Sequence, residues 1–191
     1  MRSFIALEMP PSVKDFAAGL IRELKPTGAD VKWVEPANLH LTLKFLGEVD
    51  SGATADIITA VEKSCAGRPP LELTAQGCGA FPKPRAPKVV WLGLVGDTEP
   101  LAGLAQALEA ALAPQGFEPE QRAFKPHLTL GRVRRPRRGS KAPSTAPLSR
   151  ALAGMATVAG PVFQAAGVAL MKSTLTGSGP IYEPLHRVTL A

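Results

Sequence analysis

Apolar residues along the chain recur with two periods, one typical of helices and one typical of strands. Where they recur at three- and four-residue steps, the pattern predicts amphipathic helices. Where they alternate or cluster between turn residues, it predicts strands. The predicted helices span 12–25, 50–65, 99–113 and 148–153. The predicted strands span 3–7, 31–34, 40–47, 71–76, 88–95, 127–130, 161–174 and 181–190.

The order of these elements indicates the fold class. Helices and strands do not follow each other in a regular β-α-β alternation, so an α+β fold with largely antiparallel strands is expected, its helices outside the sheets. The segment 81–87 carries three prolines and is predicted to be irregular. The reason is that proline lacks a backbone donor and has a fixed φ.

One tetrapeptide occurs twice: His40-Leu41-Thr42-Leu43 recurs as His127-Leu128-Thr129-Leu130. The chain has only three histidines, so two of them begin the same motif. On a strand, the histidine and threonine of each copy point to one face and the leucines to the other. Each copy follows a helix and a proline-containing turn. We therefore expect one domain over 1–191 with two pseudo-symmetric lobes and one copy in each.

The repeated motif brings residues suited to phosphodiester chemistry. Two imidazoles that titrate near neutral pH can act as a general base and a general acid without a metal ion. The catalytic candidates are therefore His40 and His127. The hydroxyls of Thr42 and Thr129 share the histidine faces and can donate to the phosphate oxygens. By strict alternation Lys44 also shares the face of His40.

Arg132 is a further candidate for binding phosphate, as a bidentate ligand. Strict alternation from His127 places its side chain on the opposite, leucine-bearing face of the strand. Gly131 permits a β-bulge that would turn the guanidinium back toward the histidine. The prediction for Arg132 therefore depends on that bulge.

Composition and charge add two alternatives about partners. The chain is 45% apolar and 20% charged, as in soluble globular proteins, with a formal net charge of +6. A basic chain favours polyanionic partners, although a basic loop on an otherwise neutral enzyme explains the charge equally well. The segment 132–141 carries much of this charge. It is either a solvated excursion or a contact with the phosphate backbone of a nucleic acid.

The remaining residues of chemical interest are given structural roles. Cys65 and Cys78 form no metal-binding or disulfide pattern, and no metal site is expected. His186 lacks a threonine two positions on. The chain shows neither a secretory signal nor an apolar run long enough to span a membrane. We expect a soluble, cytoplasmic monomer.

At the two motifs the sequence resembles the two-histidine phosphoesterase superfamily, whose signature is a pair of His-x-Thr-x motifs. Within that superfamily it is most similar to the bacterial and archaeal RNA 2′,3′-cyclic phosphodiesterases, also called 2′-5′ RNA ligases. The similar segments are 2–7, 40–47, 79–82, 89–93, 124–132 and 170–182. The arginine-rich run after Arg132 departs from the family pattern.

The resemblance implies a bilobal fold with a cleft between two antiparallel sheets. It also implies hydrolysis of RNA 2′,3′-cyclic phosphate ends to 2′-phosphates without a cofactor, and reverse joining through a 2′-5′ linkage. By the family pattern His40 would be the proton donor and His127 the proton acceptor. Two alternatives stay open: a nucleotide- or RNA-binding module without activity, and a cyclic phosphodiesterase for a small nucleotide metabolite.

Overall fold

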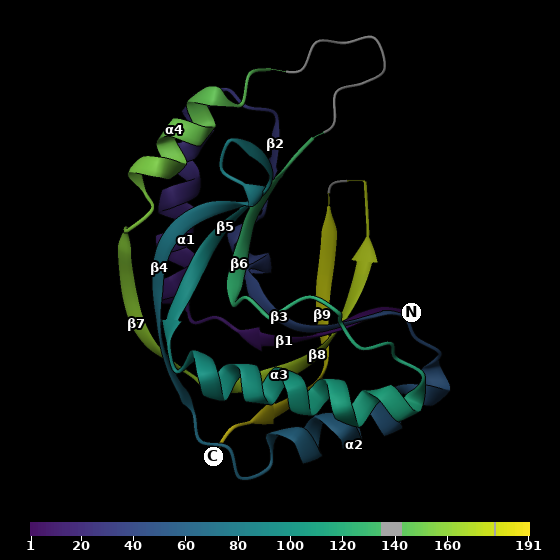
Figure 1. The fold of residues 1–191 in the computed structure, drawn as a ribbon. Helices are drawn as coiled ribbons and strands as arrows, with labels where there is room; N and C mark the ends of the chain where they lie inside the picture. The colour runs from purple at the N-terminus through teal and green to yellow at the C-terminus, as the bar shows by residue number, and fades with distance from the viewer. Residues whose placement is uncertain (135–142, 178) are drawn as a thin grey trace.

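The structure is a computed structural model that describes residues 1–134, 143–177 and 179–191. Within these residues nine strands form two sheets in which every strand pair is antiparallel (Figure 1). The four-stranded sheet has the order β3-β1-β8-β9, and the five-stranded sheet has the order β2-β6-β5-β4-β7. This confirms the predicted α+β class, with one copy of the repeated motif in each sheet.

The element bounds agree closely with most of the sequence pattern. The strands are β1 (Arg2–Glu8), β2 (Val31–Trp33), β3 (His40–Glu48), β4 (Leu71–Lys83), β5 (Ala86–Gly96), β6 (His127–Val133), β7 (Ala159–Ala165), β8 (Gly167–Leu175) and β9 (Pro180–Thr189). The helices are α1 (Pro11–Leu24), α2 (Thr54–Cys65), α3 (Thr98–Leu112) and α4 (Ala146–Gly154). No helix in the described ranges is both long and apolar enough to cross a membrane.

Two pairs of helices cover the outer faces of the sheets (Figure 1). Helices α1 and α4 pack on the five-stranded sheet, against β7 and β4, whereas α2 and α3 pack beside the four-stranded sheet, against β9 and β3. The apolar side of each helix is buried: Val13, Leu20 and Leu24 of α1 are at most 3% exposed. Removal of this apolar surface from water is the main favourable contribution to folding.

The prediction of one continuous strand over 161–174 is wrong. The chain passes from one sheet to the other near Ala166: β7 pairs with β4, and β8 pairs with β1. Apolar residues continue through the junction, with Ala165 and Val168 both buried, so the pattern alone does not reveal the change of sheet.

The prediction that 81–87 is irregular is also wrong. Strand β4 continues to Lys83 and β5 begins at Ala86, so the segment forms a β-hairpin in which Pro82 lies opposite Pro87. The strands on either side of this hairpin do not reach its tip. Strand β7 pairs with β4 only up to Gln76, and β6 pairs with β5 only from Val89. Each proline therefore lies beyond the neighbouring ladder, where a missing donor costs little.

The two cysteines are buried free thiols, and burial raises the pKa of each to about 11. Because the thiolate is the reactive form, neither Cys65 nor Cys78 should react with a thiol reagent at neutral pH in the folded protein. Titration with a chromogenic disulfide is expected to detect no thiol in native buffer and both in guanidinium chloride. Rapid labelling of the native protein would contradict this burial.

Candidate active site

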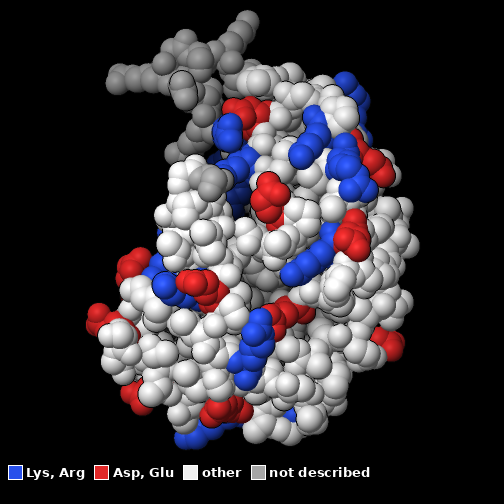
Figure 2. All heavy atoms as spheres, turned by 180° about the vertical axis from the view of Figure 1, so that it is seen from behind, with Lys and Arg blue, Asp and Glu red and all other residues white. Residues whose placement is uncertain are grey.

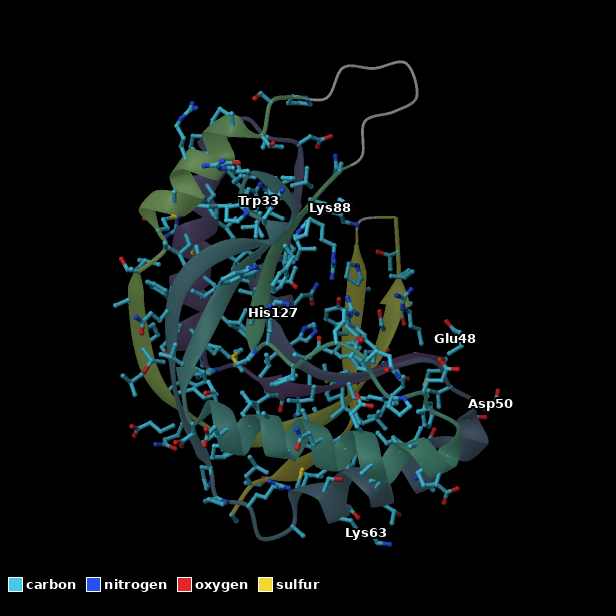
Figure 3. All side chains as sticks on the ribbon, viewed as in Figure 1. Trp33, Glu48, Asp50, Lys63, Lys88 and His127 are labelled. Carbon is cyan, nitrogen blue, oxygen red and sulfur yellow. The ribbon has the colours of Figure 1, made fainter. Side chains whose placement is uncertain are left out.

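The two motif strands lie in different sheets and contact each other across the molecule. Leu41, Leu43, Leu128 and Leu130 are all at most 5% exposed. The histidine and threonine of each copy are half-buried on the opposite face, as the alternation predicts. In Figure 3, His127 lies at the start of β6, on the side of the four-stranded sheet. The fold thus directs both histidine-bearing faces toward the region between the sheets.

Both imidazoles are held by the same local hydrogen bond. The Nδ1 atom of His40 lies 2.7 Å from the carbonyl oxygen of Asn38, and that of His127 lies 2.6 Å from the carbonyl oxygen of Lys125. A carbonyl oxygen can only accept, so Nδ1–H donates in both cases. When the ring is neutral, this bond leaves Nε2 as a proton acceptor. Each histidine is therefore oriented by the residue two positions before it.

A β-bulge follows the threonine in both copies of the motif. In β6, Thr129 pairs with Trp91 and Gly131 pairs with Val90, which leaves Leu130 as the extra residue. The predicted bulge is confirmed, and it returns Arg132 to the face of His127. A Cβ at position 131 would lie 2.6 Å from Cγ1 of Val31, so the close approach of β2 requires the glycine there.

The corresponding bulge in β3 overturns the prediction for Lys44. Ala6 pairs with Thr42 and Ile5 with Lys44, so Leu43 is the extra residue and Lys44 turns away from the face of His40. Its side chain is buried, and Nζ donates to Oε2 of Glu109 at 2.5 Å and to the carbonyl oxygen of Glu118 at 2.5 Å. Glu109 belongs to α3, so Lys44 serves the packing of that helix and does not face the site.

The charge of Arg132 acts on groups in both sheets. Burial lowers the pKa of His127, and the positive charge of Arg132 lowers it further. The same charge acts on Tyr182 of β9, where burial raises the pKa of the hydroxyl and Arg132 opposes that rise. Tyr182 in turn contacts His40 edge to face, with ring centroids 5.1 Å apart. The charge of Arg132 therefore acts on His127 in one sheet and on a ring neighbour of His40 in the other.

Aromatic rings line each histidine and complete the site. Phe4 stacks on His40 with ring centroids 4.7 Å apart, and Phe81 meets the ring of His127 edge-on at 5.0 Å. Trp91 packs on Phe81 at 5.4 Å, and its indole lies directly over Gly79, where a Cβ would come within 2.3 Å of the ring.

The repeated motif gives no indication of these aromatic residues. The signal for them was the resemblance to the family, because Phe4, Phe81, Trp91 and Tyr182 all lie in the similar segments.

The surroundings favour neutral imidazoles in the free protein. For His40, burial lowers the pKa, the hydrogen bond to Asn38 raises it and the charge of Lys14 lowers it. For His127, burial again has the largest effect and the bond to Lys125 opposes it. Desolvation disfavours the charged ring, so both histidines release a proton more readily than an exposed one.

Other residues considered in the sequence lie apart from this arrangement. Nε2 of His186 is 3.0 Å from Oε1 of Glu62 on α2, on the helix-covered side of its sheet. Of the basic segment 132–141, the structure places Arg134 3.5 Å from Asp30, and 135–141 lie outside the described residues. Among the residues that are described, no group of three His, Cys, Asp or Glu side chains could hold a metal ion.

The net positive charge does not form a uniform basic surface on the face drawn in Figure 2. Acidic and basic side chains are interspersed across that face, where the charges can compensate each other locally. Recognition of an anion there has to depend on individual cationic groups rather than on a broad field.

Two antiparallel sheets that each present a His-x-Thr strand toward the other define a two-histidine phosphoesterase. The family model described as LigT-like phosphoesterase matches residues 7–91 and 92–182, so that each match contains one motif. The chain belongs to this family.

Similar proteins cover most or all of the chain. The RNA 2′,3′-cyclic phosphodiesterase of Methanothermobacter thermautotrophicus is 37% identical over 97% of this chain and 97% of its own. That of Thermotoga maritima is 39% identical over 70% of this chain and 71% of its own. Among solved structures, TT0787 of Thermus thermophilus superposes with a TM-score of 0.80 at 26% identity, covering 100% and 98% of the two chains. Escherichia coli LigT complexed with 3′-AMP superposes with a TM-score of 0.73 at 25% identity, covering 99% and 97%.

Proposed function

We propose that this protein is an RNA 2′,3′-cyclic phosphodiesterase that opens the cyclic phosphate to a 2′-phosphate. The observation that carries the proposal is the matched pair of imidazoles, each anchored through Nδ1 to a backbone carbonyl, on strands from two facing sheets. Relatives with 30–39% identity carry this activity in their names. The proposal includes a monomer acting in the cytoplasm, where buried thiols stay reduced.

The chemistry divides between the two histidines. Nε2 of His127 accepts a proton from water as the water oxygen bonds to phosphorus. The bond from phosphorus to the 3′ oxygen breaks, and protonated His40 gives its proton to that oxygen. The bond to the 2′ oxygen remains, so the product is a 2′-phosphate with a free 3′-hydroxyl. The same steps with an RNA 5′-hydroxyl in place of water form a 2′-5′ linkage: the 5′ oxygen gives its proton to His127 and bonds to phosphorus, and the 3′ oxygen leaves with a proton from His40.

Stabilisation of the phosphate oxygens is assigned to neutral and cationic donors. Negative charge on the non-bridging oxygens grows in the transition state and is favoured by fixed donors nearby. The hydroxyls of Thr42 and Thr129 lie beside their histidines on the same strand faces. Arg132, returned to that side by the bulge, supplies a full positive charge and two parallel donors. These side chains need no metal or nucleotide cofactor for this role.

Product analysis on an oligonucleotide with a 2′,3′-cyclic phosphate end tests the proposal. Incubation in EDTA, followed by chromatography against 2′- and 3′-phosphate standards, is expected to yield only the 2′-phosphate. Tight binding without product would instead indicate a binding module. Turnover of a small cyclic-phosphate metabolite but not of the oligonucleotide would indicate a cyclic phosphodiesterase for a small nucleotide metabolite. Adding a 5′-hydroxyl oligonucleotide to the same mixture tests for ligation.

The pH dependence of kcat/KM is expected to be bell-shaped, with its maximum below pH about 6.5, the value of an unperturbed histidine. On the acid side kcat/KM falls because His127, the proposed base, gains a proton and can no longer accept one. On the alkaline side kcat/KM falls because His40, the proposed acid, has released the proton that it must donate. Because burial lowers the pKa of both, both limbs move toward lower pH. Initial rates at low substrate concentration across the acidic and mildly alkaline range measure the profile, and a rate still rising above about pH 8 would contradict it.

A further inference from the structure

A notch in the four-stranded sheet lies beside the candidate active site. Strand β1 begins at Arg2, which lies opposite Glu48 of β3. The last pair between β1 and β8 is Ser3 with Lys172, and β8 continues beyond it to Leu175. Residues 173–175 therefore pair with β9 on one side and have no strand on the other. A cavity of about 370 Å³ occupies this notch and is lined by Met1, Arg2, Glu48 and residues 172–175.

The notch opens on the face of the sheet that carries His40. Arg2 and Phe4 share a face of β1, two residues or about 6.6 Å apart along the strand. Phe4 stacks on His40, and Tyr182, which pairs with Ser173, contacts both rings. The charge of Arg2 also acts on the hydroxyl of Tyr182. The partly exposed ring of Tyr182 therefore contacts the imidazole of His40 and the buried ring of Phe4, and it lies within the influence of the charge of Arg2.

The charges in the notch leave one cation available. The ammonium of Lys172 lies 3.3 Å from Glu183, and the amino terminus lies 3.1 Å from Glu48. The side chain of Arg2 is exposed and forms no ion pair with any carboxylate in the described ranges. An exposed guanidinium without an internal partner can bind a phosphate of a ligand through two parallel donors.

We propose that this notch is a second phosphate subsite, which binds the phosphodiester on the 5′ side of the terminal nucleotide through Arg2. The inference rests on the proposed function, because a nucleotide with a 2′,3′-cyclic phosphate continues into RNA only through its 5′ oxygen. The backbone anion next to the reacting phosphate is therefore that diester, one nucleotide away. The exposed backbone edge of 173–175 and the hydroxyl of Ser173 add neutral donors beside Arg2. The protein then favours RNA ends over cyclic mononucleotides.

Steady-state kinetics on two substrates test this subsite. One substrate is a short oligonucleotide with a 2′,3′-cyclic phosphate end, and the other is the 2′,3′-cyclic mononucleotide of the same base without a 5′-phosphate. For the oligonucleotide, Arg2→Gln is expected to raise KM about five- to tenfold with kcat unchanged, because one phosphate contact is lost. For the mononucleotide, kcat/KM should stay within about twofold, because no phosphate reaches Arg2. Arg2→Lys, which keeps the charge, should recover part of the affinity.

A salt titration and a matched control separate this contact from general charge effects. The slope of log KM against log salt for the oligonucleotide should decrease by about 0.7 in Arg2→Gln, as expected for one lost contact to a single strand. Lys63→Gln removes the same charge from α2, where Lys63 points away from the sheets (Figure 3), and should change neither KM nor the slope.

An unchanged oligonucleotide KM in Arg2→Gln, or an equal loss on both substrates, would overturn the subsite while leaving the proposed function intact. A wild-type protein that hydrolyses neither substrate overturns the proposed function, and the subsite with it.

Discussion

Replacing His127 by alanine is expected to lower kcat/KM on a 2′,3′-cyclic phosphate end by about a thousandfold, the usual range for losing a general base. The water would then attack without a group to accept its proton. His40→Ala should cause a comparable loss, because the 3′ oxygen would depart without a proton. Initial rates on the oligonucleotide substrate, measured at the pH optimum of the wild type, provide the comparison.

The two variants also distinguish the proposed acid from the proposed base. The pH profile of the residual activity should lack its acidic limb in His127→Ala and its alkaline limb in His40→Ala. His186→Ala is the matched control, because this histidine pairs with Glu62 away from both motifs and its loss should leave kcat/KM unchanged. Circular dichroism and thermal unfolding verify that each variant is folded. Full activity in either motif variant would refute the acid–base assignment.

Lys44→Met is expected to lower the free energy of unfolding by about 3 kcal/mol, since it leaves Glu109 in a largely buried position without its cation. The lysine side chain is 4% exposed and the glutamate 22%. The same ammonium also donates to the carbonyl of Glu118, so the substitution removes two hydrogen bonds at once. Because Glu118 precedes the second motif, this contact joins β3 to the segment that leads into β6. Urea denaturation monitored by fluorescence measures the change.

Two further variants test whether burial of the ion pair is the cause of the loss of stability in Lys44→Met. Lys44→Met combined with Glu109→Leu should recover most of the lost stability, because an apolar pair replaces the uncompensated charge. Lys172→Met removes a lysine from an ion pair whose side chains are 40% and 56% exposed, and should cost at most about 1 kcal/mol. If Lys44→Met and Lys172→Met lower the free energy of unfolding equally, the prediction that Lys44 stabilises the interior is wrong.

The sequence predicted much of the candidate site because the signals there are local. Strand alternation placed the leucines of each motif in the core, where Leu128 and Leu130 are fully buried. The same alternation placed each histidine with its threonine. Gly131 indicated the bulge that returns Arg132 to the histidine face, since only a residue without a Cβ fits against β2 there.

The sequence did not predict features that depend on how strands pair. No glycine marks the bulge at Leu43 of β3, so the turn of Lys44 toward Glu109 is visible only in its register with β1. The apolar run across Ala165 and Val168 fits one long strand, yet its halves pair in different sheets. Phe4 and Phe81 become neighbours of the histidines through strand pairing and the β4–β5 hairpin, although each is far from its histidine in sequence.

The sequence by itself determined which side chains share a strand face, because the strand period of two residues is a property of the backbone. It therefore determined the two imidazole and hydroxyl pairs, the buried leucines and the α+β class. Only the tertiary structure decided that the two faces lie toward each other, that the charge of Arg132 acts on both His127 and Tyr182, and that Arg2 borders a notch in the same sheet as His40. Those relations come from the pairing of strands distant in the chain, which depends on long-range packing that local periodicity does not encode.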